Sequence, residues 1–236
     1  MLRLITIAIL VMATAVATLP GVLRAETAPP PPAESETLPE LSDPSLPVYQ
    51  PPPDVKYPRA RVGGVTRGSL GKDPMVVALV PDHVALTIRP QPTLYWYISQ
   101  TTTLPIFFTL QEDEIVRPIL VATLAQPKKA GIQVIRLKDY GIELKERVTY
   151  RWYVSVQRDP ESPSQDIVTG GMIERVGYPE QSILQFSLWY DLLKNICDKI
   201  EASPDDKRLR LERAALLSQI GLRQIAELDL KPSPIR

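Results

Sequence analysis

The sequence predicts a mainly β fold: an antiparallel β-sandwich followed by a C-terminal α-helical hairpin that packs on it. Between residues 59 and 177, short runs rich in β-branched and aromatic side chains follow one another at nearly regular spacing. This spacing is typical of antiparallel sandwiches, and no long helical pattern interrupts it. From Pro179 onward, apolar residues recur at steps of three and four, which indicates helices over residues 178–236.

The first 25 residues have the organisation of a signal peptide. A single basic residue, Arg3, precedes an apolar run over residues 4–19, and Ala25 offers a small residue at a cleavage position. We expect cleavage after Ala25 and a periplasmic or secreted protein. The alternative is that the run is retained as a membrane anchor. It is shorter than the roughly 20 apolar residues of a comfortable span, so we expect no stable membrane span after cleavage.

Residues 26–58 are dense in proline and carry mostly negative charge. Proline fixes φ and removes a backbone donor, so this segment is expected to be a disordered, extended and solvated linker. It could serve as a ligand for a proline-recognition module. In an exported protein we favour a stalk that holds the folded domain away from a surface.

Eight strands are expected in the β-rich domain, and turn residues separate them. They lie over residues 75–80, 83–88, 93–98, 104–110, 115–122, 131–137, 148–156 and 167–176. Pro81 and Asp82 mark the turn between the first two strands. The acidic residues 112–114 lie between the fourth and fifth strands, where we expect a solvated hairpin tip.

The clearest strand is the one over residues 148–156. Tyr150, Trp152 and Val154 share one face, and Arg151 and Tyr153 share the other. A tyrosine just inside a strand, two residues before a tryptophan, is similar to the tyrosine corner of immunoglobulin-like domains. We therefore expect an immunoglobulin-like sandwich with Trp152 in the core and the Tyr150 hydroxyl bonded to backbone.

The helical segment carries start and stop signals as well as periodicity. Its first apolar stripe consists of Phe186, Trp189, Leu193, Ile196 and Ile200. Ser203 is expected to cap the second helix, with Pro204 at its first position, and Gly221 to end it. Residues 222–228 are expected to add no more than a further turn.

Charge and composition argue against several classes of function. The chain has 27 basic and 27 acidic residues and no clustered excess of bases, so no nucleic-acid partner is expected. The single cysteine, Cys197, cannot form an internal disulfide. Together with the single histidine, His83, it cannot form a zinc site without several carboxylates, and no cofactor is expected. Cys197 is expected to be a small buried apolar residue and His83 an ordinary edge-strand residue.

No catalytic constellation stands out in the sequence. Ser69 and Lys72 have the Ser-x-x-Lys spacing of penicillin-recognising enzymes, but glycines surround the pair and no helical pattern follows. A catalytic triad would have to use His83 alone. We therefore expect that the protein is not an enzyme.

Several motifs occur in a fixed order along the chain. They are Gly63-Gly64-Val65-Thr66-Arg67-Gly68, Arg89-Pro90-Gln91-Pro92-Thr93, Tyr150-Arg151-Trp152, the glycine-led segment 170–176 and the segment 188–193. Over roughly residues 59–228 this order resembles an uncharacterised, mainly cyanobacterial family catalogued as domain of unknown function nine-two-eight. The resemblance implies an exported envelope protein without assigned activity or cofactor. Members often carry a cysteine after each of the Thr-Arg-Gly and Tyr-Arg-Trp motifs; both are missing here, so that bridge is absent.

The leading interpretation is a non-enzymatic module that binds another protein of the cell envelope. The candidate interaction residues are Arg67, Arg175 and Tyr190, and the residues expected to be structural are Tyr150, Trp152, Glu174 and Trp189. We expect Arg67 to pair with Glu174. The neighbouring glycines, Gly63, Gly64, Gly170 and Gly171, would allow tight bends or close backbone approach.

Two alternatives stay open. The first is an envelope hydrolase or carbohydrate-binding domain that uses exposed aromatic residues, either Tyr95 and Tyr97 or Trp96 on the other face of their strand. The second is an assembly factor whose C-terminal helices dock onto helical repeats.

Overall fold

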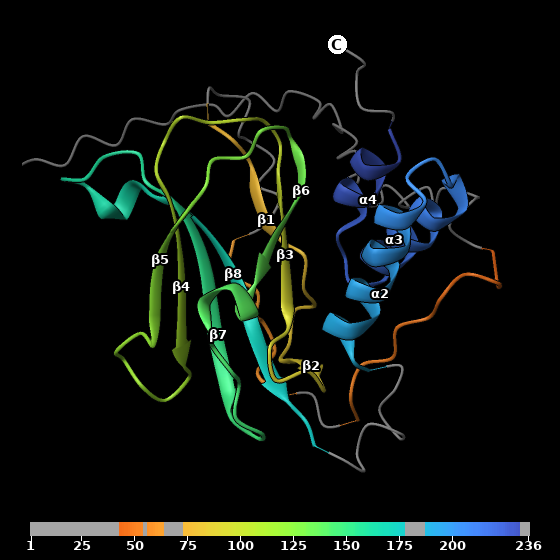
Figure 1. Cartoon of the computed structure of the whole chain (residues 1–236), viewed down its shortest axis with the longest axis horizontal. Coiled ribbons are helices and arrows are strands. Elements are labelled where there is room, and N and C mark those ends of the chain that lie inside the picture. Colours follow the sequence, from red (N-terminus) through yellow and green to blue (C-terminus); the bar gives the residue numbers. More distant parts are fainter. Residues whose placement is uncertain (1–42, 54–55, 64–72, 178–186, 232–236) are drawn as a thin grey trace, which may run out of the picture. The chain divides into compact units, whose positions relative to one another are not determined.

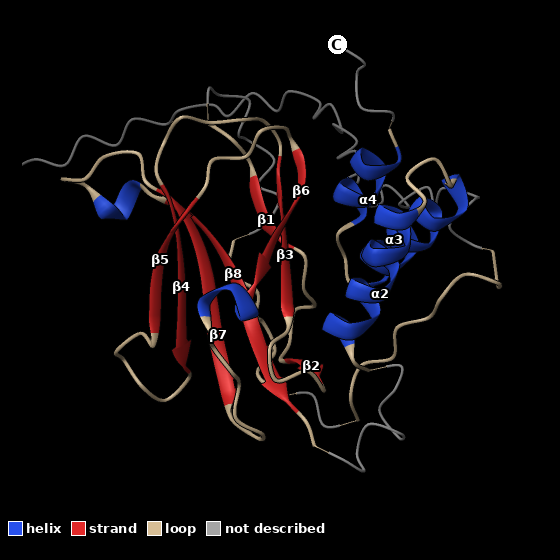
Figure 2. Cartoon of the chain, in the orientation of Figure 1, coloured by secondary structure: helices blue, strands red, loops and turns tan. Residues whose placement is uncertain are grey.

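The computed structural model describes residues 43–53, 56–63, 73–177 and 187–231, all within a compact unit that runs over Thr37–Arg236. The expected signal peptide lies outside the described residues. The strands are β1 (Val76–Ala78), β2 (Ala85–Thr87), β3 (Thr93–Ile98), β4 (Ile106–Glu112), β5 (Leu120–Leu124), β6 (Gly131–Arg136), β7 (Thr149–Val156) and β8 (Ile167–Arg175). The helices are α2 (Trp189–Ala202), α3 (Lys207–Gln219) and α4 (Arg223–Leu230), and the 3-10 turns are η2 (Leu137–Tyr140) and η3 (Pro163–Gln165). A strand overlaps each of the eight predicted ranges, but β5 begins at Leu120 rather than at residue 115, because residues 113–119 form the turn after β4. Figure 2 shows a mainly β fold with C-terminal helices.

The larger sheet has five strands in the order β2-β8-β7-β4-β5. Its neighbours pair antiparallel except at one edge, where β2 runs parallel to β8, with Ala85 opposite Ile173. The prediction of a wholly antiparallel sandwich is therefore wrong at this edge. The two strands are far apart in sequence, and no hairpin connection forces them to run in opposite directions.

The smaller sheet has three antiparallel strands in the order β1-β3-β6. Its central strand, β3, has the sequence TLYWYI, and all six of its side chains are buried. Figure 1 shows the reason: this sheet lies between the larger sheet and the helices. α2 contacts both β3 and β2, so the helices cover the face of the smaller sheet that the larger sheet leaves open.

The C-terminal segment forms three helices rather than the predicted hairpin. α2 begins at Trp189, and its apolar stripe is buried through Leu193, Ile196 and Ile200 as expected. The predicted cap of the second helix is wrong. Asp206 caps α3, because its carboxylate accepts hydrogen bonds from the backbone N–H groups of Arg208 and Leu209, while Ser203 ends α2.

The third helix, α4, begins soon after Gly221, which has a left-handed backbone with φ of 78°. This glycine ends α3 as predicted. The chain then turns back so that Arg213 of α3 forms a two-pronged ion pair with Asp229 of α4, at 2.8 and 2.7 Å. Both side chains are buried, and the pair fixes α4 against α3.

Residues 43–53, which we name the strap, correct the prediction of a solvated linker over residues 26–58. Tyr49 of the strap is buried, and its ring meets that of Trp189 edge-on at 5.1 Å. The Gln219 side chain accepts a hydrogen bond from the Tyr49 N–H and donates one to the Pro47 carbonyl. Proline-rich backbone cannot enter a sheet, but it can cover helices when its few apolar side chains find pockets. The remainder of the predicted linker before residue 43 lies outside the described residues.

Two glycines at the start of the segment 170–176 allow close approach, one to the neighbouring strand β7 and one to the residues that follow β1. A Cβ at Gly171 would lie 2.5 Å from Cγ2 of Val80, and a Cβ at Gly170 would lie 2.2 Å from the carbonyl oxygen of Trp152. At Gly63, φ is 71°. These three glycines serve the bends and close approaches that we expected, and Gly64 lies outside the described residues.

In the part of the chain that the structure describes, no helix combines the length and the apolar run that crossing a membrane requires.

Candidate interaction edge

The structure separates the three residues that the sequence nominated for partner binding. Tyr190 is only 2% exposed, so it cannot meet a partner, and that nomination is wrong. Its hydroxyl is held between the indole N–H of Trp152 and the Met172 carbonyl. Arg67 lies outside the described residues.

Arg175, the third nominated residue, ends β8 and serves the fold. Its guanidinium donates to the Leu144 carbonyl at 3.1 Å and pairs with the Glu146 carboxylate at 3.1 Å. The preceding residue, Glu174, is buried. Its carboxylate pairs with Lys56 at 3.0 Å and accepts a hydrogen bond from the Thr149 hydroxyl at 2.9 Å. Among the described residues, the partners of Glu174 are therefore Lys56 and Thr149; the expected pair with Arg67 lies outside the described residues.

The remaining structural residues lie in the core. Trp152 and Trp189 are fully buried, and the Trp189 indole donates to the Leu79 carbonyl at 2.8 Å. The Tyr150 hydroxyl accepts a hydrogen bond from the backbone N–H of Lys145 at 3.1 Å, which is the backbone bond expected of it.

The aromatic residues proposed for carbohydrate binding are also buried. Tyr95, Trp96 and Tyr97 lie in β3, in the middle layer, with a covered face on either side. Burial raises the pKa of Tyr95 and Tyr97, and Tyr95 also has Cys197 of α2 beside it. None of the three can stack on a sugar, so this expectation is wrong.

The two isolated titratable residues, His83 and Cys197, are both part of the packing. His83 lies in a bend before β2, not in an edge strand as expected, and its Nε2 is 2.8 Å from the Tyr49 hydroxyl. Burial lowers the pKa of His83, and the Asp82 carboxylate partly opposes this. Burial raises the pKa of the Cys197 thiol, which reduces its reactivity as a thiolate.

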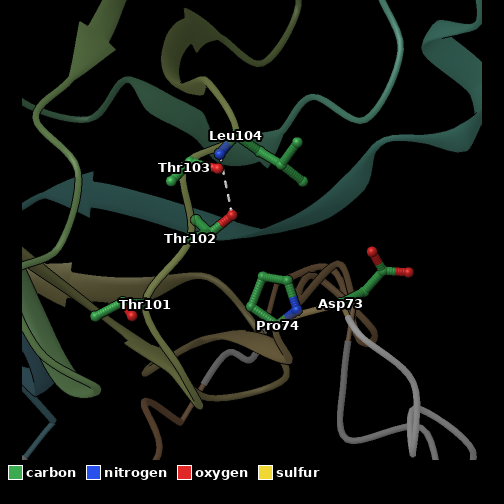
Figure 3. A pocket seen from close by; sticks show the side chains of 6 residues that line it. All are labelled: Asp73, Pro74, Thr101, Thr102, Thr103 and Leu104. Atoms are coloured by element: carbon green, nitrogen blue, oxygen red, sulfur yellow. Dashed lines mark hydrogen bonds between the residues drawn. The ribbon is translucent and has the colours of Figure 1, made fainter.

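A hollow of about 440 Å³ lies beside the loop that precedes β4. Figure 3 shows Thr101, Thr102 and Thr103 on one side of it and Asp73 with Pro74 on the other. The Asp73 carboxylate pairs with Arg158 at 2.8 Å, and the Thr102 hydroxyl accepts from the Leu104 N–H. These polar groups already have partners. Among the described residues, no group of three or more His, Cys, Asp or Glu side chains could hold a metal ion.

The exposed apolar side chains gather in a different place, on the hairpin between β4 and β5. Val116 is 93% exposed and Val121 is 62% exposed, and Ile115 and Ile119 are also exposed. By contrast, no large apolar side chain of α2, α3 or α4 is exposed in the described part of the chain. We name residues 115–126 the β5 edge. Figure 1 shows β5 at the side of the larger sheet away from the helices.

The β5 edge also presents backbone groups that the sheet leaves unpaired. β4 pairs with β7 so that Gln157 donates to Pro105 and Asp113 donates to Thr149, which places the odd-numbered β4 residues toward β7. The even-numbered β4 residues therefore face β5, and their partners are Leu120, Ala122 and Leu124. Because antiparallel pairing alternates, Val121 and Thr123 direct their N–H and C=O groups away from the sheet.

No charge protects the strand itself, although Arg117 lies in the turn before it. The segment from Pro118 to Pro127 contains no charged residue, and no proline lies between these two. In natural proteins, a lysine, an internal proline or a covering element usually prevents an edge strand from pairing with another chain. The opposite edge of the sheet has such a cover, because α2 packs on β2 and Asp191 accepts from the Ile88 N–H.

Ion pairs hold the hairpin that carries the edge. Glu112 pairs with Lys145 at 2.8 Å, and Asp113 pairs with Arg151 of β7. The acidic turn is therefore tied to the sheet, whereas the sequence suggested a solvated tip. The sequence predicted a strand here without marking it as a surface; its uncharged stretch between two prolines was the available signal.

The part of the chain that matches a known family contains the two sheets but not the three helices. No curated protein matches the chain. The family described as Domain of Unknown Function (DUF928) matches residues 62–187, which is more than half of the 236 residues. The matched segment contains all eight strands and ends before α2. The chain therefore belongs to the DUF928 family.

Proposed function

We propose that the protein is an exported, non-enzymatic interaction module of the cell envelope, which binds its protein partner by strand addition at the β5 edge. The observation that carries this proposal is that β5 has outward backbone groups and no charge, and that its exposed Val121 lies beside the exposed apolar residues of the preceding turn. In strand addition, main-chain hydrogen bonds supply affinity, and alternate side chains supply specificity. β5 offers both.

Export is supported by the amino-terminal sequence. Arg3, the apolar run over residues 4–19 and the small residue Ala25 have the order of a cleavable signal. Cell fractionation, with the mass of the mature chain, tests this part of the proposal. We expect an envelope fraction and a chain that begins at Glu26; an uncleaved chain in the cytoplasm would contradict export.

An immunoglobulin-like relationship is also part of the proposal. Two facing sheets with a buried Trp152 between them support it, as does the bond from the Lys145 N–H to the Tyr150 hydroxyl. Immunoglobulin-like domains commonly present loops and edge strands to other proteins, which agrees with a binding role for β5.

Site-specific photo-crosslinking in intact cells tests the binding surface. A photoreactive residue at Val121 lies on the β5 edge, and one at Val134 lies on β6, where the side chain is also exposed but the sheet is a different one. We expect a discrete protein adduct from position 121 and none from position 134. Equal labelling from both positions, or none from position 121 in a correctly exported protein, would refute binding at this edge.

A further inference from the structure

We infer that the partner on the β5 edge is a second copy of the same chain, paired antiparallel with β5 about a twofold axis that passes through Ala122. This inference rests on the proposed use of the β5 edge and names its occupant. It follows from the pairing pattern of the strand, from the side chains that would meet and from the lack of charge and proline over residues 119–126.

The pairing pattern permits a symmetric match. A twofold axis at Ala122 places Val121 of one copy opposite Thr123 of the other, and the reverse pair forms at the same time. Both residues direct their N–H and C=O groups away from β4, so each of these pairs can exchange two hydrogen bonds. This register pairs residues 120–124 of each copy; beyond them the Ile119 N–H already donates to the Leu110 carbonyl.

The side chains on both faces fit this register. On the outer face, the exposed Val121 comes beside the exposed Thr123 of the second copy. On the core side, the half-buried Leu120 comes beside the half-buried Leu124. Cross-strand pairs of β-branched and aliphatic residues stabilise sheets, and here they would remove apolar surface that now contacts water.

A second copy is favoured over a foreign strand because residues 119–126 carry neither a charge nor a proline that would keep identical strands apart. Every molecule presents the same uncharged strand of matching length to every other molecule. An edge reserved for a different partner would require a lysine, an internal proline or a bulge to keep identical strands apart. Pro118 and Pro127 only limit the paired length.

Sedimentation of the mature chain over a wide range of concentrations tests the inference. We expect the mass to double as concentration rises. Thr123→Pro removes an outward N–H that β4 does not use, so it is expected to weaken association by about tenfold or more while the monomer remains folded. The matched control, Thr123→Ala, keeps the N–H and is expected to associate as the wild type does. Circular dichroism verifies that both variants are folded.

Disulfide trapping provides a second readout that does not depend on a disruptive variant. In the inferred register, the two Ala122 residues form a non-hydrogen-bonded pair with Cα atoms about 4.5 Å apart. This distance is within the range of a disulfide, so Ala122→Cys is expected to give a covalent dimer on mild oxidation. Thr123→Cys, whose copies are offset along the strands, is expected to give none. Both variants retain Cys197, so that residue cannot account for a difference.

The outcomes separate this inference from the proposed function. A chain that stays monomeric at all concentrations, with no disulfide from Ala122→Cys, would overturn the second copy as partner. If Val121 then still forms an adduct with a different protein, binding at the β5 edge stands with a foreign strand as occupant. If it forms no adduct either, both are refuted.

Discussion

The indole N–H of Trp152, in the centre of the larger sheet, donates a 2.8 Å hydrogen bond to the hydroxyl of Tyr190 in the first turn of α2. The same hydroxyl donates to the Met172 carbonyl on the neighbouring strand at 3.1 Å. Both aromatic side chains are buried. One phenol group therefore connects two strands of the larger sheet to the C-terminal helices.

Tyr190→Phe removes this connection without changing the ring. We expect the free energy of unfolding to fall by about 1–3 kcal/mol, because the Trp152 N–H and the Met172 carbonyl lose their partner in a buried site. Urea denaturation measures the change. Tyr57→Phe is the control: Tyr57 is exposed, and a change within about 0.5 kcal/mol is expected there. Equal effects of the two substitutions would show that the buried hydroxyl contributes nothing specific.

The protein is expected to become less stable as the pH decreases, because its single histidine, His83, takes up a proton. Burial lowers the pKa of His83 below its ordinary value of 6.5, so the unfolded chain binds a proton there more readily than the folded chain does. Stability is therefore fully present above pH 6.5 and is lost as the pH falls from 6.5 towards the lowered folded-state value. Thermal unfolding measured across this range detects the loss.

The control for this prediction is His83→Gln, because no other histidine is present in the sequence. The carboxylates titrate in both proteins, so the difference between the two pH profiles isolates the imidazole. Identical profiles between pH 5 and pH 7 would contradict the buried, neutral His83.

Gly171→Ala is expected to destabilise the packing of β8 against the residues that follow β1 by about 1–3 kcal/mol. The new methyl group would lie 2.5 Å from Cγ2 of Val80, whose stiff, fully buried side chain has no room to move. Val80→Ala makes space, so the double variant is expected to be more stable than the sum of the two single changes predicts. Strict additivity, measured by chemical denaturation, would show that the two residues do not meet.

The strap is expected to be part of the folded domain. Tyr49→Ala removes a buried ring that packs against Trp189 and His83, and the free energy of unfolding is expected to fall by about 3–5 kcal/mol. Val48→Ala, at the exposed neighbouring position, is expected to change it by less than about 0.5 kcal/mol. If both substitutions were silent, residues 43–53 would be a solvated tether after all.

The local features of the fold could be predicted because they depend on side-chain periodicity. All eight strands follow from alternating or β-branched runs, and the burial of Tyr150, Trp152 and Val154 on one face of β7 follows from a period of two. The apolar stripe of α2 follows in the same way from a helical period. Gly221 at the end of α3 follows from the freedom of glycine to adopt positive φ.

The features that were predicted wrongly, or not at all, depend on contacts with residues far away in the sequence. The run TLYWYI looks like a half-exposed aromatic strand until the helices are known to cover its second face. Asp206 and Ser203 are both good caps, and only the backbone geometry between α2 and α3 distinguishes them. Tyr190 has the composition of an interface residue, but its hydroxyl is used internally. The β5 edge was missed because an unpaired side is a property of strand order, which periodicity does not specify.

The position of β3 has a consequence for how this protein can be divided. The DUF928 match stops at residue 187, two residues before α2, and it begins after the strap. A polypeptide cut at those limits would lack the helices that shelter Tyr95 and Tyr97 and would expose that face of the smaller sheet to solvent. The family match therefore covers fewer residues than the folded domain needs to bury its apolar surface.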